Sequence, residues 1–288
     1  MLSKVISQAN IDHVEKWFER AEKIVIVTHV SPDGDAIGSS LGLWHFLESQ
    51  EKNVNVIVPN AFPRFFTFGC PGPERYHPLR QIIKSLSDKL IAEAGCYLSV
   101  WISNALSRID AMADAVAASK GRKMMVDHHL YPGDFCRIVI SHPEISSTSE
   151  LVFRLICRLG YFEDITKEGA ECIYTGMMTD TGGFTYNSNN REIYFIISEL
   201  LSKGIDKDEI YRNVYNTYSE GRLRLMGYVL YDKMQVFPEF NSALIWLTKE
   251  EQGKFQYVKG DTEGFVNIPL SIRMSVSLFS CARIRRKT

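Results

Sequence analysis

The chain has 288 residues, of which 45% are hydrophobic and 23% charged, so it can bury a substantial core in one large domain or two modest ones. Its formal net charge of −1 excludes the strongly basic surface that binds long double-stranded nucleic acid, although local cations could still hold a short or mononucleotide substrate. The six cysteines form no C-x-x-C pair, and no apolar run reaches the roughly 20 residues of a membrane span. We therefore expect free thiols in a reducing compartment, no membrane segment and a cytoplasmic location.

Short β-branched runs alternate with helical patterns along the first 180 residues. Residues 24–27 form an apolar run, and from Ala36 to Leu47 the apolar residues recur at helical spacing. The same reasoning predicts strands at 54–58, 97–102, 123–126 and 137–140, helices at 11–21, 85–94, 108–119, 147–159 and 167–178, and irregular chain at 62–80. This alternation is typical of an α/β fold with a doubly wound parallel sheet.

Beyond residue 186 the alternation ends. The pattern predicts helices at 190–203, 207–213 and 219–233, followed by a strand at 234–237, a turn at 238–241 and a strand at 242–247. We expect a first domain over 1–188, a helical linker over 189–230 and a smaller α/β domain over 231–288. Residues 271–288 contain no acid, so we expect this last domain to be truncated.

The loop after the first strand carries His29, Asp33 and Asp35. In open α/β sheets, ligands bind at the carboxyl ends of the strands. One imidazole and two carboxylates within seven residues can converge on a divalent metal. Asp-Gly-Asp is also common turn chemistry, and Asp35 could instead cap the following helix.

Two later segments place similar residues at comparable points of the fold. Asp127, His128 and His129 directly follow a short buried strand, and Asp180 follows the predicted helix 167–178, just before a Gly-Gly turn. Imidazole together with several carboxylates suits Mn²⁺, and two such ions would serve phosphoryl hydrolysis. Each segment also has a structural alternative, in which Asp127 caps, His128 is a core histidine and Asp180 starts a turn. The combination favours a shared metal site.

Two further features suit a phosphate. Arg108 offers a planar guanidinium fork, and the hydroxyls of Ser147 and Thr148 lie at a predicted helix start that favours anions. Ser147 could equally well cap its helix.

These motifs resemble the DHH phosphoesterase superfamily, and more closely its oligoribonucleases (nanoRNases) that also dephosphorylate 3′-phosphoadenosine 5′-phosphate. The matching segments are VTHVSPDGDAIGSSLGL (27–43), NALSRID (104–110), VDHH (126–129), ISHPEISSTSELV (140–152) and YTGMMTDTGGFTYNS (174–188). The resemblance implies a DHH catalytic domain, a DHHA1-like substrate-binding domain and a two-manganese centre.

The resemblance also implies roles for individual residues. The metal ligands would be His29, Asp33, Asp35, His128 and Asp180. His129 would face the substrate phosphate, and Asp127 would orient the histidine pair as part of the catalytic machinery, together with His128.

Two departures from the family pattern stand out. The family has an aspartate that bridges the two metals just before Asn-Ala-Leu-Ser-Arg, and here Ile102 stands at that position. The nearby polar residues, Ser103, Asn104 and Asp110, do not match it. The Gly-Gly-Gly-His-type motif of the second domain is also absent.

We therefore expect a manganese-dependent phosphoesterase acting on short oligoribonucleotides and nucleoside 3′,5′-bisphosphates. A catalytically impaired member that binds metal or nucleotide without turnover, losing one of the two metals, is the first alternative. A cyclic-dinucleotide phosphodiesterase is the second alternative. The sequence is compatible with a homodimer.

Overall fold

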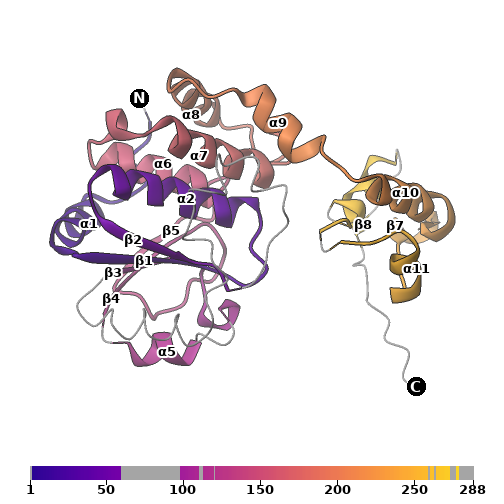
Figure 1. Ribbon diagram of the computed structural model, residues 1–288, viewed down its shortest axis with the longest axis horizontal. Helices are drawn as coiled ribbons and strands as arrows, with labels where there is room; N and C mark the ends of the chain where they lie inside the picture. Colours follow the sequence, from indigo (N-terminus) through magenta and orange to yellow (C-terminus); the bar gives the residue numbers. More distant parts are fainter. Residues whose placement is uncertain are drawn as a thin grey trace. The chain divides into compact units, whose positions relative to one another are not determined.

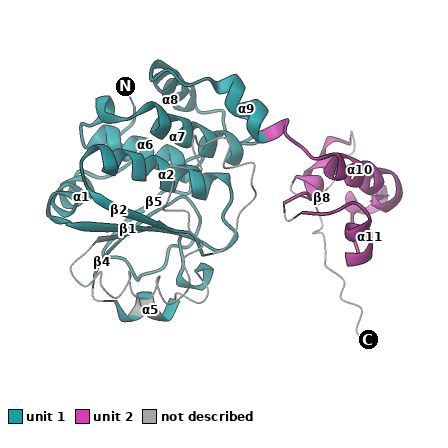
Figure 2. Ribbon diagram, in the orientation of Figure 1, with its two compact units in different colours: residues 1–214 teal, residues 215–288 magenta. Residues whose placement is uncertain are grey.

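The computed structural model describes residues 2–59, 98–109, 113–119, 121–258, 260–262, 264–272 and 277–278 (Figure 1). The chain divides into two compact units, Met1–Val214 and Tyr215–Thr288 (Figure 2). The division falls inside the predicted linker 189–230, and the predicted domain limits stay a prediction.

Unit 1 is built on a parallel sheet whose described strands lie in the order β2-β1-β3-β4-β5. The strands are β1 (Lys23–Thr28), β2 (Asn53–Ile57), β3 (Leu98–Ile102), β4 (Arg122–Asp127) and β5 (Ile138–Ser141). Its helices are α1 (Gln8–Arg20), α2 (Gly34–Ser49), α5 (Ala113–Ala118), α6 (Thr148–Arg158), α7 (Lys167–Asp180), α8 (Arg191–Ser202) and α9 (Lys207–Tyr215), the last of which crosses into unit 2. The predicted α/β fold with a parallel sheet is confirmed.

The strand order reverses direction at β1. The chain passes from β1 through α2 to β2 on one side of β1, whereas β3 pairs with β1 on the other side. Helices α2 and α6 cover one face of the sheet, α7 packs on these two helices, and α5 covers the other face of the sheet (Figure 1). Such a reversal leaves a crevice at the carboxyl ends of the strands, where ligands bind in open α/β sheets. Register brings these ends together, because Thr28 of β1 pairs with Ile102 of β3.

The face of the sheet under α5 is closed by apolar side chains of the central strands. Val25 and Val27 of β1, Trp101 of β3 and Val116 of α5 are buried in one cluster. Val25 and Val27, two residues of the β-branched run that predicted the first strand, therefore form part of this core. Consecutive buried residues along β1 show that both faces of this strand are covered, as expected for a parallel sheet.

Helices α2, α6 and α7 approach one another closely on the opposite face, because glycines lie at their contacts. A Cβ on Gly38 of α2 would lie 2.5 Å from the carbonyl oxygen of Cys172 in α7. A Cβ on Gly176 of α7 would lie 1.9 Å from Oγ of Ser149 in α6. Neither position has space for a larger side chain, so glycine sets the distance between these helices.

Unit 2 begins with α10 (Glu220–Tyr228), which runs into the π-helical turn η6 (Val229–Lys233). Strands β6 (Gln235–Phe237) and β7 (Ser242–Leu244) pair antiparallel, and β8 (Ser277–Leu278) pairs parallel to β7. The turn between β6 and β7 contains η7 (Pro238–Phe240) and ends at Asn241 in the left-handed region. Helix α11 (Lys249–Lys254) and the 3-10 helix η8 (Phe265–Ser271) complete the described elements of this unit. Leu225, Val229 and Phe265 lie in its small core.

Most predicted elements are found within a few residues of their expected limits. Of the predicted helix 108–119, the described residues form the end of a 3-10 turn, η3 (Leu106–Arg108), and α5, and residues 110–112 lie outside the described part of the chain. The strand predicted at 242–247 ends at Leu244. The carbonyl of Arg108 accepts a hydrogen bond from the amide of Val30 at 2.7 Å, so it is not available to an α-helix that starts here. The irregular segment predicted at 62–80, the helix predicted at 85–94 and the tail beyond 278 lie outside the described residues.

Two expectations from composition concern cysteines and membranes. Within the described part of the chain, Cys136, Cys157 and Cys172 form no disulfide, and burial raises the pKa of Cys136 and of Cys157 to about 12. Among the described helices, none combines the length and the apolar character that crossing a bilayer requires.

Replacing Gly176 with alanine should destabilise unit 1, because the new methyl group would overlap the Ser149 hydroxyl. Overpacking of this kind typically costs about 1–3 kcal/mol. Urea unfolding followed by circular dichroism measures the loss. Gly227→Ala in α10 is the matched control, since a Cβ there meets no atom within 4 Å and alanine favours the helix. An unchanged unfolding midpoint for Gly176→Ala would contradict the packing argument.

Candidate functional site

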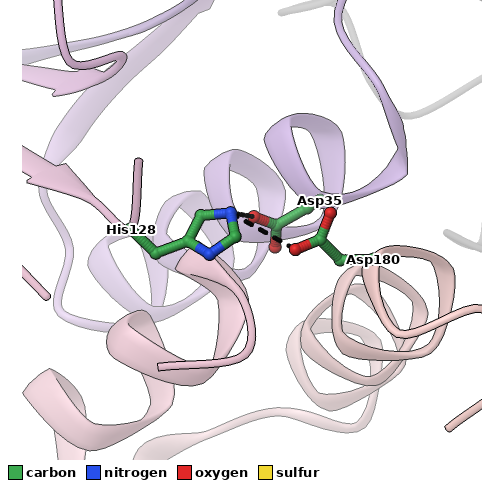
Figure 3. A group of neighbouring side chains, drawn as sticks. All are labelled: Asp35, His128 and Asp180. Carbon is green, nitrogen blue, oxygen red and sulfur yellow. Dashed lines mark ion pairs between the residues drawn. The ribbon is translucent and has the colours of Figure 1, made fainter. Parts of the chain in front are cut away.

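Three side chains from distant parts of the sequence meet at the carboxyl edge of the sheet. Asp35 lies in the first turn of α2, His128 follows β4, and Asp180 is the last residue of α7. One ligand atom from each lies within 4.8 Å of the other two. Nε2 of His128 is 3.2 Å from Oδ2 of Asp180 and 3.8 Å from Oδ2 of Asp35 (Figure 3). An imidazole and two carboxylates at this spacing fit a divalent cation.

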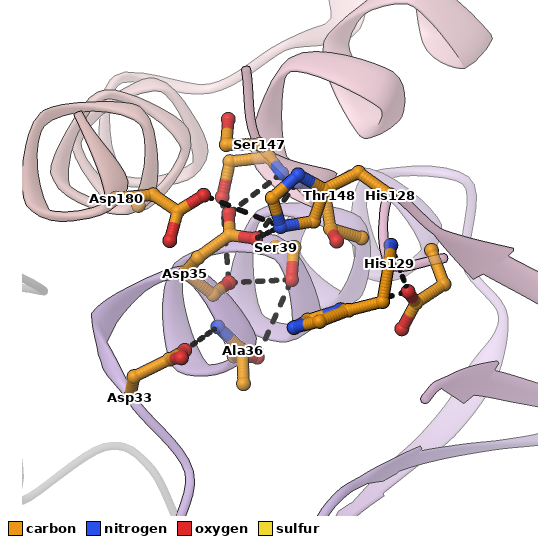
Figure 4. Close-up of polar contacts among 12 residues, drawn as sticks. Asp33, Asp35, Ala36, Ser39, His128, His129, Ser147, Thr148 and Asp180 are labelled. Atoms are coloured by element: carbon orange, nitrogen blue, oxygen red, sulfur yellow. Dashed lines mark hydrogen bonds and ion pairs between the residues drawn. The ribbon is translucent and has the colours of Figure 1, made fainter. Parts of the chain in front are cut away.

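Asp35 is held from behind by the start of α6. Its Oδ2 accepts a hydrogen bond from the amide of Thr148 at 2.7 Å, and its Oδ1 accepts one from the amide of Ser149 at 2.8 Å. Two amides at a helix N-terminus favour the ionised carboxylate. The side chain is nearly inaccessible to solvent, so its direction is fixed within the core (Figure 4).

The imidazole of His128 is oriented by a backbone carbonyl. Its Nδ1 lies 3.2 Å from the oxygen of Ile145, which can only accept a hydrogen bond. With Nδ1 directed at this carbonyl, Nε2 is the ring nitrogen that faces the carboxylates of Asp35 and Asp180. Metal-ligating histidines usually have such a partner on the other ring nitrogen.

His129 is paired with a buried carboxylate. Oδ1 of Asp127 lies 2.8 Å from Nδ1 of His129 and also accepts a hydrogen bond from the backbone amide of His129. The Asp127 side chain is 1% exposed, whereas that of His129 is 37% exposed. The ring of His129 is 4.8 Å from that of His128, centroid to centroid. Asp127 thus contacts His129, and the roles that the resemblance implies for Asp127 and for the two histidines stay predictions.

His29 and Asp33 are not part of the three-residue group. Nδ1 of His29 lies 2.9 Å from the carbonyl oxygen of Val30, and its ring is 6.3 Å from the ring of His129. Asp33 is the N-cap of α2 and accepts a hydrogen bond from the amide of Ala36 at 2.9 Å (Figure 4). Asp33, not Asp35, therefore caps this helix. The ligand roles of His29 and Asp33 stay predictions.

The three residues expected to contact phosphate have protein partners in this structure. Nη1 of Arg108 donates to Oδ1 of Asn104 at 3.2 Å. Ser147 is the N-cap of α6, and its hydroxyl accepts a hydrogen bond from the amide of Glu150 at 3.0 Å. Thr148 is buried and donates its amide to Asp35. Capping is thus one role of Ser147, and contact with substrate stays a prediction for all three.

Sequence reasoning missed the part of Asn104 in shaping the site. Its side-chain Nδ2 donates to the backbone carbonyl of Leu130 at 2.8 Å, and its backbone carbonyl accepts a hydrogen bond from the amide of Gly133 at 2.7 Å. The loop after β3 is therefore tied to the loop after β4. An asparagine two residues after a predicted strand end is the sequence signal, since its side chain commonly bonds to nearby backbone.

The carboxylates of the cluster outnumber the positive charges near them. Burial, together with the negative charges of Asp35 and Asp33, raises the pKa of Asp180 to about 8. Burial also raises the pKa of Asp35, an effect that His128 opposes. Carboxylates this close repel one another in a poorly solvated site. A divalent cation would offset that repulsion, so the residues present fit a metal ion.

We predict that Asp180→Asn stabilises the metal-free protein increasingly as the pH rises from 5 to 8.5. The Asp180 carboxyl titrates near its ordinary 3.8 when unfolded and at about 8 when folded, so folding takes up a proton between these values. The stability from this group is therefore complete below pH 4 and is lost as the pH rises through 8. Asparagine has no such titration.

The measurement is urea unfolding of both proteins in a chelator at the two pH values. A stability difference that is the same at pH 5 and pH 8.5 would contradict the assignment.

Three known proteins show what this chain is similar to. An exopolyphosphatase-related protein from Bacteroides fragilis, known from its crystal structure, is 73% identical, with a TM-score of 0.87 over 94% of this chain and 79% of that one. The bifunctional oligoribonuclease and PAP phosphatase NrnA of Thermus thermophilus is 32% identical over 72% of this chain. The cyclic-di-AMP phosphodiesterase PdeA of Listeria monocytogenes is 24% identical over 71% of this chain and 31% of its own length. This chain spans 58% of the length of the Thermus relative.

The model of the N-terminal domain of the DHH family matches residues 23–177. That segment covers more than half of the 288 residues and contains Asp35 and the Asp127–His128–His129 run. Asp180 follows three residues later at the end of the same α7 helix. The chain therefore belongs to the DHH family.

Proposed function

We propose that this chain is a metal-dependent phosphoesterase that hydrolyses short oligoribonucleotides and nucleoside 3′,5′-bisphosphates. The observation that carries the proposal is the convergence of Asp35, His128 and Asp180 beside the Asp127–His129 pair. Relatives named as oligoribonuclease and PAP phosphatase support the substrate class. Manganese suits a donor set of imidazole and carboxylates.

Each residue of the site has a distinct task in this proposal. Asp35, His128 and Asp180 would hold the metal, which when bound supplies positive charge that polarises the phosphate and activates water. Asp127 fixes Nδ1 of His129, so that Nε2 is the ring nitrogen able to meet a phosphoryl oxygen or transfer a proton. Arg108 would bind a second phosphate oxygen once it exchanges its contact with Asn104.

A catalytically impaired member of the family is the second candidate, and one residue favours it. Ile102 ends β3 and is 2% exposed at the edge where the ligands converge. Its branched alkyl group cannot coordinate a metal. A missing carboxylate at this position would leave a second cation beside the first with less negative charge between them.

Turnover of a short oligoribonucleotide should require Mn²⁺ and Asp35. Asp35→Asn should lower kcat/KM by at least a hundredfold, because the amide lacks the negative charge that would hold the metal. Each tenfold loss corresponds to about 1.4 kcal/mol of transition-state stabilisation. Asp134→Asn is the matched control, since Asp134 is an exposed acid in the loop after β4. The measurement is hydrolysis of a dinucleotide and of a nucleoside bisphosphate with Mn²⁺ or with chelator. Hydrolysis that persists in chelator, or that survives Asp35→Asn, would sink the proposal.

The two candidates differ in what Ile102→Asp should do. If the isoleucine impairs the site, the aspartate variant should bind one more Mn²⁺ per chain and hydrolyse substrate at least tenfold faster than the unaltered chain. Ile102→Asn is the matched control, because it has nearly the same shape as aspartate without the charge. Bound metal is counted after dialysis, in parallel with the assay. Two Mn²⁺ per unaltered chain, with brisk turnover, would instead show that Ile102 does not impair it.

A further inference from the structure

The turn Ser146–Ser149, which leads into α6 and includes its first two residues, lies between two buried carboxylates. On one side, the amides of Thr148 and Ser149 donate to the two oxygens of Asp35. On the other side, both the amide and the hydroxyl of Ser146 donate to Oε2 of Glu150, at 3.2 and 2.6 Å. The whole turn is buried. The position of the Asp35 carboxylate therefore depends on where Glu150 holds the turn.

Glu150 is in turn held by a single arginine. Nε and Nη2 of Arg154 lie 2.9 and 2.6 Å from Oε1 of Glu150, and both side chains are at most 2% exposed. The two oxygens of Glu150 thus have separate tasks, with Oε1 bound to Arg154 and Oε2 bound to Ser146. Arg154 also reaches Glu192 of α8 at 2.8 Å. Neither Glu150 nor Arg154 belongs to the metal cluster.

Burying this ion pair is a poor way to stabilise the fold. Removing two charges from water costs free energy that their attraction barely offsets, and well-packed apolar residues of similar volume often stabilise a core as well or better. What apolar residues cannot do is accept the two hydrogen bonds of Ser146 in a fixed direction. The geometry of the pair is thus suited to setting the position of the turn.

We propose that Glu150 and Arg154 are positioning residues that fix the metal ligand Asp35 through the Ser146–Ser149 turn. This inference rests on the proposed metal site. The chain of contacts runs from Arg154 to Glu150, to Ser146, and through the turn to the two amides on Asp35. Groups that orient metal ligands from behind typically change metal affinity by 10–100-fold when they are removed.

The test compares variants on the same helix. Glu150→Leu/Arg154→Met replaces the pair with apolar side chains of similar volume, so the core stays filled and no charge is left unpaired in α6. Glu192 of α8 loses its contact with Arg154 but is 18% exposed and keeps its hydrogen bonds from Ser3. Glu150→Gln is the second variant, because it keeps the shape of the side chain while removing its charge. Arg158→Met is the matched control, since Arg158 also lies on α6 and bonds to the carbonyl of Ile6 at 2.7 Å, but not to the turn.

Two measurements are made on each purified, folded protein. Titration calorimetry gives the Kd for Mn²⁺, and hydrogen exchange of the metal-free protein follows the amides of Thr148 and Ser149. We expect the double variant to bind Mn²⁺ at least tenfold more weakly and to exchange both amides at least tenfold faster. Glu150→Gln should change both in the same direction, and Arg158→Met should leave both within twofold of the unaltered chain.

The outcomes separate this inference from the proposed function. If the double variant and Glu150→Gln bind Mn²⁺ and protect both amides as the unaltered chain does, the positioning role is wrong. If Arg158→Met weakens binding equally, the effect is general destabilisation and the inference is again wrong. If the unaltered chain binds no Mn²⁺, the proposed function fails, and the amide exchange still decides whether Glu150 and Arg154 position Asp35.

Discussion

The carboxylate of Asp35 is the contact on which the arrangement of this site depends. It belongs to α2 but is bonded to the first amides of α6, so it joins two helices that are more than one hundred residues apart in the sequence. Nε2 of His128, after β4, faces the same carboxylate. A buried anion accepts such a position only where hydrogen bonds replace water, and the N-terminus of α6 supplies them. Helix packing and ligand geometry are therefore settled by the same interaction.

The position of the third proposed ligand, Asp180, depends on the close approach of α7 to α6. Gly176 of α7 lies directly against Ser149 of α6, and a Cβ there would be 3.2 Å from Oδ1 of Asp35. One turn later in α7, Asp180 ends the helix opposite His128. Any side chain at Gly176 would move this end of α7 away from α6 and α2. The small residue inside the helix thus sets the distance between the two carboxylates, and with it their electrostatic repulsion.

The fold and the ligand cluster could be read from the sequence for one reason. Buried parallel strands are short β-branched runs, and the polar residues that follow them must share one edge of the sheet, which brings His128 to Asp35. The partners of these residues were not predictable in the same way. The amides of Thr148 and Ser149 have no signature, because every residue but proline has one. Asp33 and Asp35 are two positions apart, and only the geometry of α2 shows which one caps it.

Three loops at the mouth of the site are joined by backbone bonds. The amide of Val30 donates to Arg108, and the amide of Gly133 donates to Asn104, so the loops after β1, β3 and β4 are linked in series. A residue inserted into one of them would displace both of the others. We expect these loops to keep their lengths among descendants of this gene, so that new substrate preferences arise by exchange of side chains. This edge of the sheet would then diversify by substitution, with the spacing of its three loops preserved.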